Sequence, residues 1–322
     1  MVKKVVLLFF VAFSVSCIGL KQNYKNTFVV AGTYLEVTSP YKEAAEVVHE
    51  EFRRLEKIFN IYDEDSEISL LNKTYRVNFR VSWELIEVLI LAKEVYRMTN
   101  GAFDVSCGRL YAFWKDLTKQ KDVGEFPSRK EIGKLKALCG MEYIELNPQK
   151  KTVSIKREGL KIDLSGIAKG YMVDKAVGKL KAKGIESALI NAGGDIYCLG
   201  KNGKKPWRVG IKDPQQRGVL IKSEELQNEA VATSGGYEQF FEFKEKKYSH
   251  LIDPRSGFPV SNSVLSVSVV RNNCVTADSL ATAFFVMGPE KIEKFLANKR
   301  YNIKVFVVSE NSKGEREVRI FQ

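Results

Sequence analysis

Apolar side chains recur along much of the chain at the spacing of helices or strands. Between residues 44 and 59 they fall three or four positions apart, which predicts an amphipathic helix opening near Ser39 and Pro40. Similar patterns predict helices over 83–98, from a capping box at Ser128 and Glu131 onward, and over 169–183, 277–287 and 290–298. Short β-prone runs predict strands over 28–31, 34–37, 143–146, 152–155, 187–191, 208–211, 265–270 and 303–308. Because helices and strands intermix without a repeat or a long linker, we expect one α+β domain with a mixed β-sheet and flanking helices.

The first sixteen residues follow a different pattern. Two lysines precede an uninterrupted apolar run that ends in small residues, the order of a secretory signal too short to span a bilayer. Cys17 follows as in a bacterial lipoprotein box, although Ser14 stands where a larger aliphatic residue is usual. A plain cleaved signal with an incidental cysteine is the alternative.

The lipoprotein interpretation divides the chain into three parts. Residues 1–16 are the predicted signal peptide, residues 17–27 are a lipidated Cys17 and its polar tether, and residues 28–322 are the predicted globular domain. Two acyl chains anchor a protein stably where one does not. We therefore expect an exported protein, lipid-anchored at the outer, periplasmic face of the bacterial cytoplasmic membrane.

Composition excludes several classes of protein. The chain has 322 residues, 44% of them hydrophobic and 11% aromatic, which excludes a disordered protein. Only two histidines are present, too few for the multi-histidine sites of zinc hydrolases. The five cysteines include no C-x-x-C pair, so a zinc ribbon or a thioredoxin-like centre is not expected. The four cysteines besides Cys17 are open to two interpretations, disulfide pairing or buried free thiols.

The positive charge does not indicate a nucleic-acid partner. The formal net charge is +12, and it falls to +10 without Lys3 and Lys4 of the predicted signal. The remaining lysines are spread along the chain with acidic residues between them. Because they form no single basic stripe interleaved with aromatic residues, we expect no nucleic-acid binding.

Three glycine-rich segments follow predicted strands, at residues 163–171, 191–195 and 232–237. Glycines between a strand and a helix leave backbone N–H groups able to face an anion, and the start of the helix adds its dipole. Each segment alone is equally compatible with a tight turn. Together they predict a nucleotide cradle built from several loops.

Two further segments carry candidate chemistry. His250 lies three residues before Asp253 in a turn and could act as a base or an orienting group, or simply be a loop histidine. The other histidine, His49, is expected to be an ordinary surface residue. Asp278 and Thr282 are four residues apart, so their side chains share one helical face. Such hard oxygen ligands suit Mg²⁺, although a helix cap and a packed threonine would give the same pattern.

Five segments in order, at residues 101–104, 163–170, 191–195, 250–257 and 276–282, resemble the motifs of the ApbE family, the FAD:protein FMN transferases. The resemblance extends from Ala31 to the helix that starts near Ala277. It implies a mixed sheet with helices that binds FAD and Mg²⁺ in a cleft. It also implies transfer of FMN from FAD to a Thr or Ser hydroxyl of an acceptor protein, with release of AMP.

The resemblance also implies roles for individual residues. The expected FAD contacts are Ala31, Tyr62, Ala102, Phe103, Asp104, Asp163, Lys169 and Ile252. The expected metal ligands are the carbonyl of Gly166 and the side chains of Asp278 and Thr282, and the expected catalytic residues are His250 and Asp278. Ala31 departs from the family, which often has methionine there. Ala281 stands where some members carry another acid, so no second carboxylate ligand is expected at that position.

The acceptor implied by the resemblance is an exported subunit of a membrane redox complex. Two other functions fit the same residues: an FAD pyrophosphatase that yields FMN and AMP, and a non-catalytic lipoprotein that binds FAD. Release of AMP separates the two enzymes from the binding protein. Covalent flavin on an acceptor separates the transferase from the pyrophosphatase.

Overall fold

The computed structural model describes residues 22–119, 124–216, 218–236, 240–243, 246–297, 302–311 and 313–322. The predicted signal peptide and Cys17 lie outside these residues. No helix in the described ranges is long and apolar enough to cross a membrane.

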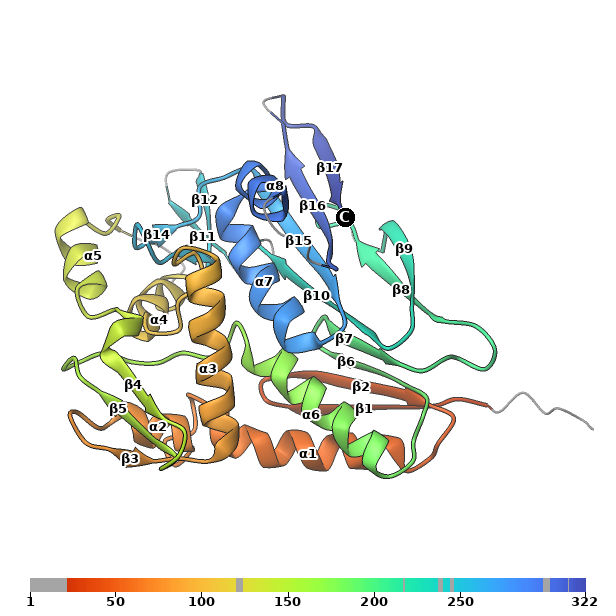
Figure 1. The fold of residues 1–322 in the computed structure, drawn as a ribbon. Helices are drawn as coiled ribbons and strands as arrows, with labels where there is room; N and C mark the ends of the chain where they lie inside the picture. Colours follow the sequence, from red (N-terminus) through yellow and green to blue (C-terminus); the bar gives the residue numbers. More distant parts are fainter. Residues whose placement is uncertain are drawn as a thin grey trace, which may run out of the picture.

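An eight-stranded sheet forms the centre of the molecule (Figure 1). In spatial order its strands are β1 (Tyr24–Val30), β2 (Thr33–Ser39), β6 (Ala188–Ala192), β7 (Asp195–Leu199), β10 (Glu229–Gly235), β15 (Val264–Arg271), β16 (Lys304–Glu310) and β17 (Arg316–Phe321). The prediction of one α+β domain with flanking helices is confirmed. The sheet is not mixed in strand direction, however, because every described pair of neighbours in it is antiparallel.

Helices and small sheets surround this sheet. The helices are α1 (Ala44–Phe59), α2 (Glu67–Asn72), α3 (Trp83–Met98), α4 (Gly108–Leu117), α5 (Arg129–Lys136), α6 (Ala168–Ala182), α7 (Cys274–Met287) and α8 (Pro289–Ala297), with a 3-10 turn at Met141–Tyr143. The small sheets are β3 (Phe79–Arg80) with β5 (Thr152–Ile155) and β4 (Ile144–Asn147), β8 (Trp207–Lys212) with β9 (Leu220–Leu226), β11 (Phe240–Phe243) with β12 (Lys246–Ser249), and β13 (Ile252–Asp253) with β14 (Phe258–Pro259).

The helical periodicity of α1 and α3 is confirmed, as is the Ser128–Glu131 capping box at the start of α5. The start of α1 was predicted wrongly. Ser39 ends β2, where its hydroxyl donates to the carbonyl of Ser187 at 2.7 Å, and the helix begins only at Ala44. The strand β1 begins at Tyr24, so the last residues of the predicted tether belong to the sheet. Strand pairing thus outweighs the local cap pattern at Ser39 and the polar composition of the tether at Tyr24.

His49 is more buried than predicted. Its side chain is only 21% exposed, and its ring stacks on Phe28 with centroids 4.1 Å apart. Phe28 belongs to β1, so the histidine helps α1 to cover the edge of the sheet.

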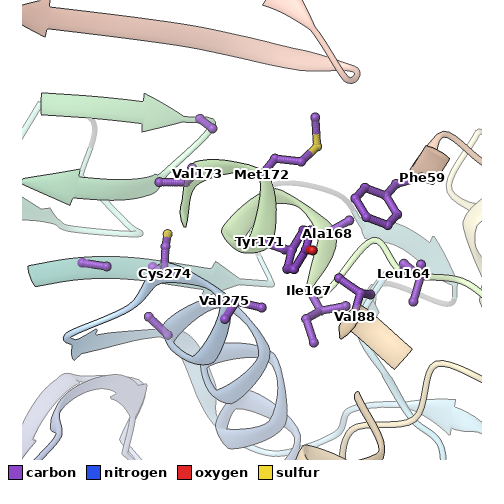
Figure 2. Packing of buried hydrophobic residues seen from close by; sticks show 14 of the residues in the cluster. Phe59, Val88, Leu164, Ile167, Ala168, Tyr171, Met172, Val173, Cys274 and Val275 are labelled. Carbon is purple, nitrogen blue, oxygen red and sulfur yellow. The ribbon is translucent and has the colours of Figure 1, made fainter. Parts of the chain in front are cut away.

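The helices α6 and α7 cross closely beside the sheet, as Figure 2 shows for Tyr171 and Val173 of α6 and Cys274 and Val275 of α7. The crossing requires glycine at position 170, because a Cβ atom there would lie 2.5 Å from the carbonyl oxygen of Cys274. The carboxylate of Asp174 on α6 caps α7 by accepting the backbone N–H groups of Cys274 and Val275 at 2.8 and 2.9 Å. The position of α7 is therefore fixed by α6.

The Asp174 carboxyl makes the free energy of unfolding of the protein depend on pH. Burial raises the pKa of Asp174 to about 6, above its ordinary 3.8. The folded state then holds this proton more tightly than the unfolded state, so the stability it contributes is greatest at acidic pH and is lost as pH rises through 6. We expect the difference in unfolding free energy between wild type and Asp174→Asn to fall by about 2 kcal/mol from pH 4 to pH 7. Urea titrations of both proteins at four pH values would measure it, and a constant difference would contradict the assignment.

Candidate functional site

A cavity of about 690 Å³ opens where the turns and helix starts on one side of the central sheet meet. Its wall includes every residue predicted to hold FAD or a metal, or to act in catalysis: Ala31, Tyr62, Ala102, Phe103, Asp104, Asp163, Gly166, Lys169, His250, Ile252, Asp278 and Thr282. These residues span most of the chain, from the β1–β2 turn to α7. The fold therefore brings the predicted site together in one place.

The turn at Ala31 shows why this site needs glycines. Ala31 and Gly32 both have left-handed backbones, with φ of 52° and 68°, and the N–H of Ala31 donates to Glu56 at 2.9 Å. Opposite them, a Cβ atom on Gly193 would lie 2.2 Å from the hydroxyl of Thr33. The glycine in the 191–195 segment thus permits close packing of two chain segments at the cavity wall.

The loop before α6 differs from the expected anion cradle. The amides of Ile167 and Ala168 donate to the carbonyl of Leu164, and the amide of Gly170 donates to Asp278 at 3.1 Å. Most of the amides expected to face an anion are therefore engaged within the protein. Positive charge at this end of the cavity comes instead from the ammonium group of Lys169.

Asp278 in the cavity wall has a second buried carboxylate, that of Asp195, beside it. Asp278 is 4% exposed and Asp195, the first residue of β7, is 1% exposed. The two side chains are close enough for each charge to act on the other, and Lys169 forms an ion pair with Asp195. Burial and the neighbouring Asp278 raise the pKa of Asp195, which the Lys169 ammonium only partly offsets. Burial would lower the pKa of Lys169, but Asp195 and Asp278 outweigh it and raise that pKa. This arrangement favours a proton or a cation between the carboxylates.

The hydroxyl of Thr282 lies one helical turn beyond Asp278. It is 3.1 Å from the hydroxyl of Ser234, and a Cβ atom on Gly166 would lie 3.4 Å from it. A carboxylate, a hydroxyl and a neighbouring backbone segment thus lie together, which is a hard-oxygen donor set compatible with Mg²⁺. No group of three or more His, Cys, Asp or Glu side chains that could hold a metal occurs among the described residues. A cation here would depend on hydroxyl, carbonyl and ligand oxygens as well as on carboxylate.

His250 lies in the wall of the same cavity, just before β13. The carboxylate of Asp253 accepts two hydrogen bonds from the Arg255 guanidinium, both at 2.8 Å. The aspartate nearest to His250 in sequence is therefore engaged with this arginine.

The cavity wall also contains aromatic residues, among them an exposed Tyr62 and a buried Phe103. Tyr62 is 69% exposed, and the ammonium of Lys115 lies 5.0 Å from its ring centroid. Phe103 is buried, and the buried carboxylate of Asp104 accepts hydrogen bonds from the amide and hydroxyl of Ser106. An exposed aromatic ring beside a cation suits a planar ligand at the entrance.

Sequence reasoning assigned no role to three residues of this site: Lys115, Asp195 and Ser234. Asp195 and Ser234 lie in glycine-rich segments that had been singled out, but nothing in their spacing indicated that they meet α7. Lys115 lies in α4 and had no motif around it. The second carboxylate near Asp278 comes from β7, whereas position 281 holds a buried alanine.

The fold and the cavity define a single-domain α+β protein with a polar and aromatic cleft suited to a nucleotide. The chain belongs to the ApbE family, whose model matches residues 31–307. A relative from Haemophilus influenzae named FAD:protein FMN transferase is 32% identical over 281 residues, covering 84% of this chain and 80% of its own. The resemblance to the ApbE family that the sequence indicated is thereby confirmed.

Solved structures agree with this assignment. The ApbE protein from Thermotoga maritima superposes with a TM-score of 0.81 at 32% identity, covering 92% of this chain and 96% of its own. The flavin transferase ApbE from Vibrio cholerae gives a TM-score of 0.82 at 29% identity, covering 93% of this chain and 97% of its own.

Proposed function

We propose that this protein transfers FMN from FAD to a Thr or Ser hydroxyl of an acceptor protein and releases AMP. The observation that carries the proposal is the single cavity that unites all the residues expected from the family motifs. The names of the relatives, FAD:protein FMN transferase, support the same reaction.

The reaction requires attack of the acceptor oxygen on the FMN-side phosphorus of FAD. The new phosphoester bond forms as the pyrophosphate bond breaks, and AMP leaves. His250 is the residue proposed to take the proton of the attacking hydroxyl, and Lys169 adds positive charge at the same cavity wall. Tyr62 and Phe103 offer aromatic surface for the flavin ring.

We also propose that Mg²⁺ binds between Asp278, Thr282 and the carbonyl of Gly166. Once bound, it would neutralise charge that develops on the pyrophosphate oxygens. Support comes from the buried carboxylates of Asp195 and Asp278, whose mutual repulsion favours a nearby cation. Asp195 would then act by orienting Asp278 and Lys169.

Incubation of the protein with FAD, MgCl₂ and a threonine-containing acceptor domain tests the reaction. The expected result is an FMN adduct on the acceptor, detected by intact mass, with an equal amount of AMP. A matched acceptor with Thr→Val at the modified position should give no adduct. AMP and free FMN without an adduct on the intact acceptor would favour the pyrophosphatase. Bound FAD without AMP would overturn both enzymes in favour of a binding protein.

The membrane location is a separate proposal, supported by the sequence pattern at the N-terminus. Lipidation of Cys17 would hold the enzyme at the periplasmic face of the cytoplasmic membrane, beside exported subunits of redox complexes as acceptors. Cys17→Ser is expected to move the protein from the membrane fraction to the soluble fraction of lysed cells. Retention of the variant in the membrane fraction would contradict lipid anchoring at this residue.

Asp195→Asn is expected to raise the Mg²⁺ concentration needed for half-maximal activity by roughly ten- to a hundredfold. The asparagine keeps the size of the side chain but removes the charge that pairs with Lys169 and contacts Asp278. Asp213→Asn is the matched control, since Asp213 is also buried and ion-paired, but its partner Arg316 does not line the cavity, whereas Lys169 does. An equal effect of both substitutions would mean that Asp195 acts through general stability.

A further inference from the structure

Two of the cysteines meet behind the loop that carries Ala102, Phe103 and Asp104. Cys107 precedes α4 and is 1% exposed, whereas Cys139 follows α5 and is partly exposed. Cys107 belongs to an apolar cluster against which Cys139 packs, and the Cys139 thiol, whose hydrogen bond goes to the Leu135 carbonyl at 3.7 Å, raises the pKa of Cys107.

The backbones on either side of this pair are also joined. The N–H of Gly140, next to Cys139, donates to the hydroxyl of Ser106, next to Cys107, at 2.7 Å. The chain segments that carry the two thiols are therefore held together, one residue away from each cysteine. The remaining described cysteines, Cys198 and Cys274, are buried in two other apolar clusters.

We propose that Cys107 and Cys139 form a disulfide bond that ties the cavity-lining loop to the end of α5. Such a bond suits an exported protein, because extracytoplasmic compartments are oxidising. The oxidant is a second disulfide, either oxidised glutathione or a disulfide-bonded thiol oxidoreductase.

The chemistry balances as two thiol–disulfide exchanges. The partly exposed Cys139 attacks the oxidant as a thiolate, forms a mixed disulfide and releases one thiol. Cys107 then attacks the Cys139 sulfur, the second thiolate leaves, and it takes up the proton that Cys107 loses, so a second thiol is released. The two cysteines together lose two electrons and two protons, and the oxidant disulfide is reduced to two thiols.

The same segment positions a cavity residue. The Ser106 hydroxyl that accepts from Gly140 also donates to the Asp104 carboxylate at 2.6 Å, and the Tyr111 hydroxyl donates to the Asp104 carbonyl at 2.8 Å. A covalent bond between Cys107 and Cys139 would fix this arrangement. It would also stabilise the fold by constraining the unfolded chain.

Disulfide mapping tests the bond without any change at the pair itself. The full chain with Cys17→Ser is incubated with oxidised or reduced glutathione, alkylated after unfolding, digested and analysed by mass spectrometry. The expected product of oxidation is one cross-linked peptide pair containing Cys107 and Cys139, with Cys198 and Cys274 alkylated. Four alkylated thiols after oxidation, or a cross-link between other cysteines, would overturn the proposal.

A second readout tests the effect on the cavity and rests on the proposed FAD site. Oxidation is expected to raise Tm by several degrees and to tighten FAD binding several-fold, and Cys139→Ser should abolish both responses. Cys198→Ser, at a buried thiol in another cluster, should retain them. If the mapped bond forms but FAD affinity does not change, the disulfide does not position the loop. If the bond forms and the protein binds no FAD in either state, the proposed FAD site fails instead.

Discussion

Asp278→Asn is expected to reduce FMN transfer on the order of a thousandfold or more while the protein remains folded. Asp278 supplies the only carboxylate in the proposed metal-binding set, so its loss removes the anionic ligand that would hold the cation. The asparagine oxygen can still accept the hydrogen bond that Gly170 donates at 3.1 Å. AMP release at saturating FAD and Mg²⁺ would measure the loss.

The thermal stability of Asp278→Asn, unlike its activity, should not fall. Wild-type Asp278 and Asp195 are adjacent buried carboxylates, and removing one charge relieves their repulsion. Without metal, Asp278→Asn should therefore be at least as stable as wild type in thermal unfolding with EDTA, as expected for a strained functional site. Ser279→Ala is the neighbouring control on α7, because its hydroxyl donates to the Val275 carbonyl at 2.8 Å. Full activity of Asp278→Asn, or a loss that follows a lowered Tm, would remove Asp278 from the metal site.

The local parts of this structure were predictable from the sequence because local rules govern them. The apolar stripe of α1, the helix α3 and the capping box at Ser128 all depend on residues within a few positions of one another. The cavity residues were found through motifs, each of which is also a short local segment. Their meeting in one cavity follows from the family resemblance and not from spacing.

Contacts between distant segments were not predictable in the same way. Asp195 begins β7 and Asp278 lies on α7, so their contact depends on how α6 and α7 cross beside the sheet. That crossing depends in turn on Gly170 and on the cap from Asp174. Strand direction also depends on contacts between distant segments, because a β-prone run does not indicate which neighbouring strand it will pair with. The sheet was therefore expected to be mixed, whereas its pairs are antiparallel.

His250→Gly is expected to slow FMN transfer by about a hundred- to ten-thousandfold with little change in FAD affinity. The imidazole of His250 is one of many groups in the cavity wall, so its removal should leave most contacts with the nucleotide in place. The rate of the chemical step should fall, because no other group is proposed to take the hydroxyl proton. Single-turnover FMN transfer and FAD titration would separate these two quantities.

Added imidazole separates a proton-accepting role from a structural one. If His250 acts as the base, imidazole in the buffer should restore part of the rate of His250→Gly, with a dependence on imidazole concentration. The other histidine provides the control: His49 stacks on Phe28 outside the cavity wall, so His49→Gln should retain wild-type transfer and should not respond to imidazole. A slow His250→Gly enzyme that binds FAD normally and is not rescued would assign His250 to orienting the substrate. An unchanged rate of FMN transfer in His250→Gly would exclude His250 from the reaction, because a base and an orienting group both have to contact the reacting groups.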